Sequence, residues 1–136
     1  MKKLIVNEQK NIEKKHVLPP GYTLIHKSPK DNLTHLNPSK SSKLYSFFGA
    51  QYNDTGRVYF VLIKKPKSNE ELSTGGWGVG DHIYELDSKI SGFYVDAENS
   101  YSRGATRAFD IEKDAKKGDF AVFVKTDKPL KVKQLK

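Results

Sequence analysis

The chain has 136 residues, no cysteine and a formal net charge of +8, and 36% of its residues are hydrophobic. This length fits one domain with one core, and the lack of cysteine excludes disulfides and cysteine-ligated zinc. No hydrophobic run approaches the roughly 20 residues of a membrane span, and the short hydrophobic run after the basic N-terminus falls below the roughly 7–15 residues of a secretory signal. We therefore expect a cytoplasmic protein.

The first third of the chain predicts an arm followed by the start of a domain. We expect residues 1–18 to form a basic arm, with a short helix over about 8–15, and a single domain over 19–136. Hydrophobic and β-prone residues predict a strand over 22–26, after a Pro-Pro-Gly sequence that ends the arm. We expect a helical turn within residues 28–37. The hydrophobic run near residues 44–48 does not distinguish strand from helix.

The rest of the chain is dominated by strand signals. Alternating or continuous hydrophobic runs predict strands over 57–63, 82–86, 93–96, 119–124 and 130–135. The glycine-rich stretch before residue 80 lacks the strand-before and helix-after context of a phosphate loop, so we interpret it as a mobile loop. Outward lysines in the last strand are typical of a sheet edge. These features predict an α+β domain that is rich in strands and has few short helices.

The positive charge is concentrated in the two ends of the chain. Residues 1–30 hold seven lysines against two acidic residues, and residues 125–136 hold five against one, which gives +5 and +4. The other 94 residues sum to −1. Basic ends predict an acidic partner, either nucleic acid or a protein surface, although they also serve solubility alone. With only three arginines in the chain, phosphate contact is favoured over base reading.

The segment Tyr22–Pro29 places a histidine and a hydroxyl two positions apart. His26 and Ser28 should point to the same face of a strand, which suits a polar ligand such as a ribose. The alternative is a partly exposed histidine at a strand end that has no ligand. We expect no metal site, because His16 and His35 have no second ligand at metal-binding spacing.

Three segments occur in the order Leu24–Pro29, Gly56–Phe60 and Gly118–Phe123. Together they resemble the ADP-ribosyltransferase superfamily, in the histidine–tyrosine–acid branch of diphtheria toxin, the poly-ADP-ribose polymerases and the small rifamycin-modifying transferases. Residues 82–86 and 93–96 are similar to a strand pair of pertussis-like transferase toxins. The resemblance implies a split-sheet α+β fold that binds NAD. It also implies transfer of ADP-ribose to an unidentified protein, nucleic acid or small molecule, or hydrolysis of NAD.

The resemblance also implies roles for four residues. His26 would hydrogen-bond a ribose hydroxyl, and Ser28 would fix the ribose or the nicotinamide amide. Tyr59 would stack on the nicotinamide ring, which is a cationic heterocycle. Asp119 would anchor the ribose 2′-hydroxyl and stabilise positive charge that develops at the ribose carbon. The implied catalytic set is therefore His26, Tyr59 and Asp119.

Departures from the family pattern keep other interpretations open. Lys27 stands where the family has glycine, and Asp119 stands where it usually has glutamate. Glu85 and Glu98 are alternative acids, and Glu85 could also contact the cofactor. In the simpler alternative, Tyr59 packs in the sheet, Asp119 is a turn residue and Glu85 points to solvent. The protein would then be a non-catalytic basic binding or inhibitory protein, such as a phage-encoded one, acting on an acidic protein or nucleic acid.

Overall fold

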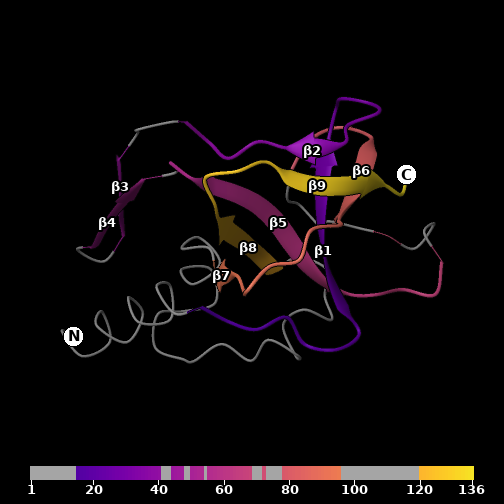
Figure 1. Ribbon diagram of the computed structural model, residues 1–136, viewed down its shortest axis with the longest axis horizontal. Coiled ribbons are helices and arrows are strands. Elements are labelled where there is room, and N and C mark those ends of the chain that lie inside the picture. The colour runs from indigo at the N-terminus through magenta and orange to yellow at the C-terminus, as the bar shows by residue number, and fades with distance from the viewer. Residues whose placement is uncertain are drawn as a thin grey trace.

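A computed structural model describes the fold of part of the chain (Figure 1). The described residues are 15–40, 44–47, 50–53, 55–68, 72, 78–95 and 120–136, with 44–47, 50–53 and 120 described for the backbone alone. These residues contain strands and no helix. The predicted α+β class is therefore wrong, and the described part is all-β. Residues 8–14 of the helix predicted over about 8–15, and the acids Glu98 and Asp119, lie outside these residues.

Seven strands form one antiparallel sheet in the order β2-β9-β6-β1-β5-β8-β7. Their bounds are β1 Tyr22–Ser28, β2 His35–Leu36, β5 Arg57–Lys64, β6 His82–Leu86, β7 Tyr94–Val95, β8 Phe120–Lys125 and β9 Leu130–Gln134. A separate hairpin is formed by β3, Leu44–Phe47, and β4, Ala50–Asn53. The longer strands occur where the alternation of the sequence predicts them.

The central strand β1 changes partner along its length. Tyr22–Ile25 pair with β5, and Ile25–Ser28 pair with β6, so β1 joins the two halves of the sheet. Strand β8 pairs with β5, which separates it from β1 in the sheet order. Strand β9 is not the edge expected from its lysines, because it lies between β6 and the two-residue strand β2. The edge of β9 is covered by β2, and the lysine side chains of β9 project from a face of the sheet.

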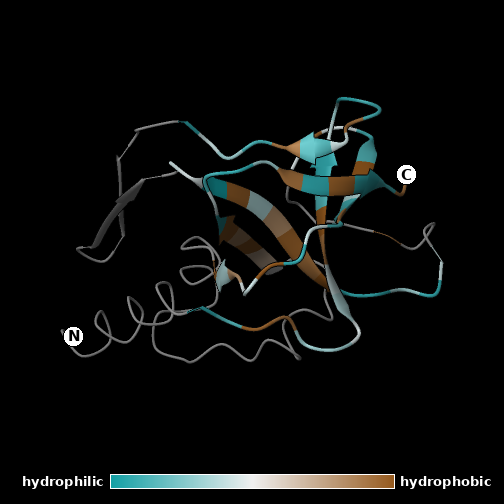
Figure 2. Cartoon of the chain, in the orientation of Figure 1, coloured by the Kyte–Doolittle hydropathy of each residue, from teal (hydrophilic) through white to brown (hydrophobic). Residues whose placement is uncertain are grey.

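The sheet is curled around its main core. The buried cluster includes residues from strands at opposite ends of the sheet order, and these are Leu36, Leu130 and Val132 at one end and Val95, Val122 and Val124 at the other. These side chains meet only if the sheet bends toward itself, and Figure 1 shows β9 crossing in front of β1. The brown bands along β5, β8 and β9 in Figure 2 mark the hydrophobic positions that this core buries. Burial of hydrophobic area is the main term that stabilises such a sheet.

The opposite face of the sheet carries a smaller core. Ile25, Val61, Ile63 and Ile83 pack there with Leu72, which is outside the strands. These residues alternate in sequence with those of the main core, as strand geometry requires. The sheet therefore buries hydrophobic side chains on both faces, which explains why β5 reads as a continuous hydrophobic run.

The predicted helical turn over 28–37 is wrong, since this segment is a loop with bends that leads into β2. Its backbone is satisfied by the phenol of Tyr84, which donates to the carbonyl oxygen of Lys30 and accepts from the backbone N–H of Leu33. Asn32 adopts a left-handed conformation with φ of 59°, which asparagine tolerates better than most residues. Bonds to distant strands replace the local bonds of a helix here.

Candidate functional site

The structure places His26 on the main-core face of the sheet. Its ring meets the ring of Phe60 edge to face at 6.1 Å between centroids. The β1–β5 ladder ends at the pair Ile25↔Val61, and beyond that point the Nδ1–H of His26 donates to the carbonyl oxygen of Tyr59 at 2.8 Å. The imidazole therefore satisfies a backbone acceptor where the two strands separate.

The ring of Tyr59 lies on the other face of the sheet. Its neighbours Val58 and Phe60 are both in the main core, so the side chain between them points away from that core. The Tyr59 ring packs instead against the ring of Phe123, with 5.7 Å between centroids. The structure thus brings His26 to the Tyr59 backbone but does not bring the two rings together.

Ser28 lies two residues after His26 and is buried. Its hydroxyl oxygen accepts a hydrogen bond from the backbone N–H of Lys30 at 3.2 Å, which holds the turn after β1. Gly80 packs directly against this turn, since an added Cβ atom would lie 2.2 Å from the backbone nitrogen of Pro29. Ser28 therefore has a structural partner within its own turn.

Glu85 is a buried carboxylate with several partners on the face that carries the smaller core. It is 6% exposed, accepts a hydrogen bond from the hydroxyl of Thr23 at 2.7 Å, and lies 3.2 Å from the ammonium of Lys133 and 3.8 Å from that of Lys65. Burial alone would raise the pKa of Glu85, but the hydrogen bonds and the two lysine charges outweigh it, and the pKa is lowered. Glu85 is therefore ionised, and the two lysine ammonium groups balance its negative charge.

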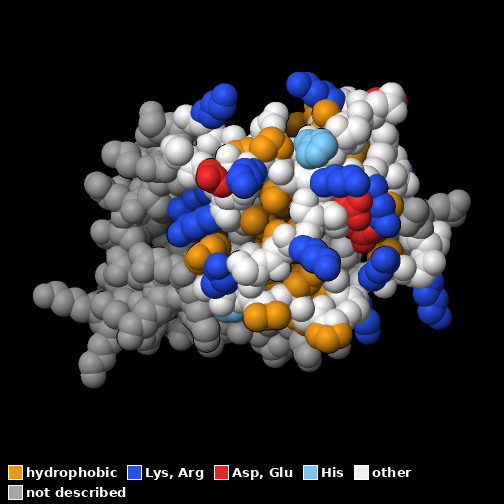
Figure 3. All heavy atoms as spheres, in the orientation of Figure 1, with side chains coloured by type: hydrophobic (Ala, Val, Ile, Leu, Met, Phe, Trp, Pro, Cys, Tyr) orange, Lys and Arg blue, Asp and Glu red, His pale blue; other side chains and the backbone are white. Residues whose placement is uncertain are grey.

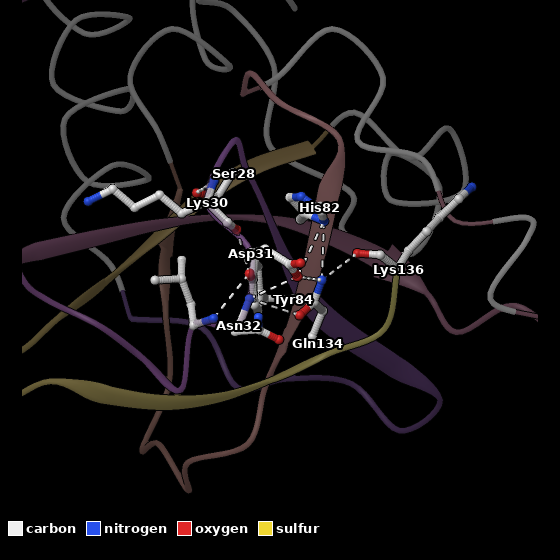
Figure 4. A network of polar contacts seen from close by, with 9 residues as sticks. Ser28, Lys30, Asp31, Asn32, His82, Tyr84, Gln134 and Lys136 are labelled. Carbon is white, nitrogen blue, oxygen red and sulfur yellow. Dashed lines mark hydrogen bonds and ion pairs between the residues drawn. The ribbon is translucent and has the colours of Figure 1, made fainter.

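A polar network that sequence reasoning missed joins the loop after β1 to the end of β9 (Figure 4). The side-chain amide of Gln134 donates to Asp31 at 2.7 Å and to His82 Nδ1 at 3.2 Å, and its oxygen accepts from the backbone N–H of Asn32 at 3.1 Å. The hydrogen bond from Gln134 lowers the pKa of Asp31, with smaller contributions from Asn32 and His82. The members of the network bond to one another, which is typical of a network that stabilises the fold.

A hollow of about 230 Å³ lies where the two ends of the curled sheet approach each other. Polar groups make up much of its lining, and Ile90, Val124 and Leu130 contribute a hydrophobic part, which we call the floor. Lys15, Lys89 and Lys125 also line it, and none of its described lining residues is acidic. Figure 3 looks onto this face, where basic side chains surround hydrophobic atoms below β9. We call this feature the lysine-rimmed hollow.

Backbone pairing brings the lysines of the hollow together from distant parts of the chain. His16 and Phe93 form a bridge in which each backbone N–H donates to the other's carbonyl oxygen, at 2.8 and 2.9 Å. Lys15 donates to the hydroxyl of Ser91 at 3.0 Å as a result. The ammonium of Lys125 lies 4.4 Å from the centre of the Tyr94 ring, because β7 pairs with β8. The two basic ends of the sequence thus meet at one place.

Gly92 makes this approach possible. A Cβ atom at Gly92 would lie 2.6 Å from the carbonyl oxygen of His16 and 2.6 Å from the Cγ of Lys15. Contacts of this length do not occur between real side chains and backbone, so only glycine allows the segment to lie against residues 91–93. The charge distribution predicted the two basic ends. Nothing in the sequence around Gly92 or Lys89 indicated that these residues lie beside those ends.

Comparison of the chain with protein-family models, with curated proteins and with solved structures gives no match. Within the described residues, no three histidine, aspartate or glutamate side chains gather in a way that could hold a metal ion. In the same part of the chain, no helix has the length and hydrophobicity that crossing a membrane requires.

Proposed function

We propose that this protein is a non-catalytic binding protein of the cytoplasm, whose lysine-rimmed hollow binds an acidic surface of another protein. The observation that supports this most directly is that Lys15 and Lys125, from the two basic ends of the sequence, meet Lys89 around a hollow whose described lining contains no acidic residue. The charges of Lys15 and Lys89 attract an oppositely charged surface to the hollow and steer its approach.

The residues around the hollow argue against sequence-specific reading of nucleic acid and against stacking on bases. The three basic side chains that line the hollow in the described part of the chain are all lysines, which act as point charges toward carboxylates and phosphates alike rather than as bidentate readers of bases. The only arginine among the described residues is Arg57, which is 9% exposed and lies 4.0 Å above the ring of Phe123. Binding of single strands also uses exposed aromatic platforms, whereas Tyr59 and Tyr94 pack against Phe123.

The other function expected from the motifs is NAD-dependent ADP-ribosyl transfer. That chemistry needs a histidine, an aromatic ring and a carboxylate around one nicotinamide riboside. His26 and the ring of Tyr59 lie on opposite faces, and Glu85 is held by Thr23 and Lys133. This arrangement supports a binding role over catalysis, and the hollow is also small for a dinucleotide, because ligand pockets usually reach about 300–1,000 Å³.

A comparison of three ligands tests the proposal. The purified protein is titrated with poly-L-glutamate, with single-stranded DNA of matched charge and with NAD, at several salt concentrations. We expect poly-L-glutamate to bind best, with an affinity that falls as salt rises and is unchanged by His26→Ala. Tighter binding of DNA would contradict a protein partner. Release of nicotinamide from NAD that is lost in His26→Ala would establish the transferase instead.

A further inference from the structure

We infer that the lysine-rimmed hollow recognises an acidic peptide segment that carries one aliphatic side chain between its carboxylates. This inference rests on the proposed function and goes further, because it names the chemistry of the recognised segment. The hollow combines two features that a charged patch alone does not need, a hydrophobic floor and a defined volume.

The floor supplies a binding site for a hydrophobic group. Val124 and Leu130 are core residues whose edges reach the hollow, and Ile90 packs against the same core while remaining partly accessible. A volume of about 230 Å³ has room for one aliphatic side chain and little more. Because the hollow is open to solvent on one side, a guest side chain that contacts these residues would leave water in part.

The rim supplies the carboxylate contacts. Lys89 is exposed beside Ile90, and Lys15 lies across the loop with its ammonium 3.0 Å from the Ser91 hydroxyl. A carboxylate that arrives there meets positive charge and a hydroxyl donor, and the described lining residues include no acid to repel it. A second copy of this chain does not fit, because its own net charge is +8.

Two fluorescein-labelled peptides with equal charge test the inference. Each has three glutamates on either side of a central residue, which is leucine in one peptide and serine in the other. We expect the leucine peptide to bind at least about tenfold more tightly at the same salt concentration. Ile90→Ser should abolish this preference, whereas the matched control Val79→Ser, at a position that is 74% exposed and outside the hollow, should keep it.

A second variant guards against misfolding of Ile90→Ser. Lys89→Glu changes an exposed residue, and we expect it to weaken binding of both peptides by a similar factor. Equal affinities for the leucine and serine peptides that still depend on Lys89 would overturn this inference and leave the proposed function standing. If neither peptide binds at low salt, or if the free protein sediments as a dimer through this face, both are wrong.

Discussion

The imidazole of His26 and the phenol ring of Tyr59 lie on opposite faces of one sheet, although the imidazole donates a hydrogen bond of 2.8 Å to the Tyr59 carbonyl oxygen. The pair Ile25↔Val61 sets this relationship, since the next position along β1 falls beside Phe60. A shift of one residue in that pairing would exchange the faces of every side chain in β5. His26 is therefore a residue that holds two strands together.

Replacement of His26 by alanine should lower stability and leave binding of acidic ligands intact. The change removes one hydrogen bond and an edge-to-face ring contact, so we expect a loss of about 1 kcal/mol in the free energy of unfolding. Urea denaturation measures this loss. His35→Ala serves as the control, because His35 is exposed and its replacement should change stability by less than about 0.5 kcal/mol.

Glu85 should make the protein lose stability in acid. Its pKa is lowered in the folded state, so its ionised form contributes stability above the unfolded-state value of 4.5, and this contribution disappears as the pH falls through the lower folded value. Thermal melts between pH 7 and pH 3 should show a shallower decline for Glu85→Gln than for the wild type. Asp87→Asn, which changes an exposed ion pair with Lys131, should keep the wild-type slope. Parallel curves for Glu85→Gln and the wild type would contradict the assigned role.

Tyr84→Phe should destabilise the fold without creating a cavity. Tyr84 is 0% exposed, and its phenol satisfies both the Lys30 carbonyl and the Leu33 backbone N–H. Loss of the hydroxyl leaves two backbone groups without this partner, and we expect a cost of about 1–3 kcal/mol in urea denaturation. Tyr94→Phe keeps the ring that Lys125 covers and should cost less. Equal effects of the two changes would argue against the loop-holding role of Tyr84.

Gly92→Ala should weaken both the fold and the binding of acidic ligands. The added methyl group collides with the His16 carbonyl and the Lys15 side chain, so the segment that brings Lys15 to the hollow must move. We expect a loss of about 1–3 kcal/mol in stability. Gly21→Ala is the control, since Gly21 has a φ of +82° but no described atom within 4 Å of the place that an added methyl group would occupy. Binding of poly-L-glutamate should fall for Gly92→Ala alone.

Local sequence patterns predicted the longer strands well, because a continuous hydrophobic run such as Arg57–Lys64 already records burial on both faces of a sheet. They failed for 28–37, where β2 is two residues long and exists only through its pairing with β9. They also could not decide which faces His26 and Tyr59 occupy. That depends on the register between β1 and β5, which is set by long-range pairing.

For the candidate site, too, the local sequence predicted some features, and long-range pairing determines the rest. The charge count located Lys15 and Lys125 in the two basic ends, but nothing local placed Lys89 beside them. The hollow exists because residue 16 pairs with residue 93 and because β7 pairs with β8. Neither contact has a sequence signature, since each depends on strands far apart in the chain. The hydrophobic floor was visible only as ordinary core residues.

The most direct test of the account is a matched pair of double charge reversals. Lys15→Glu with Lys89→Glu changes the hollow, and Lys64→Glu with Lys67→Glu changes two exposed lysines at and just beyond the far end of β5 by the same total charge. Affinity for poly-L-glutamate is measured for both at one salt concentration. We predict a loss of at least about tenfold for the first pair and a much smaller loss for the second. Equal losses would show that net charge alone drives binding and that the hollow is not the site.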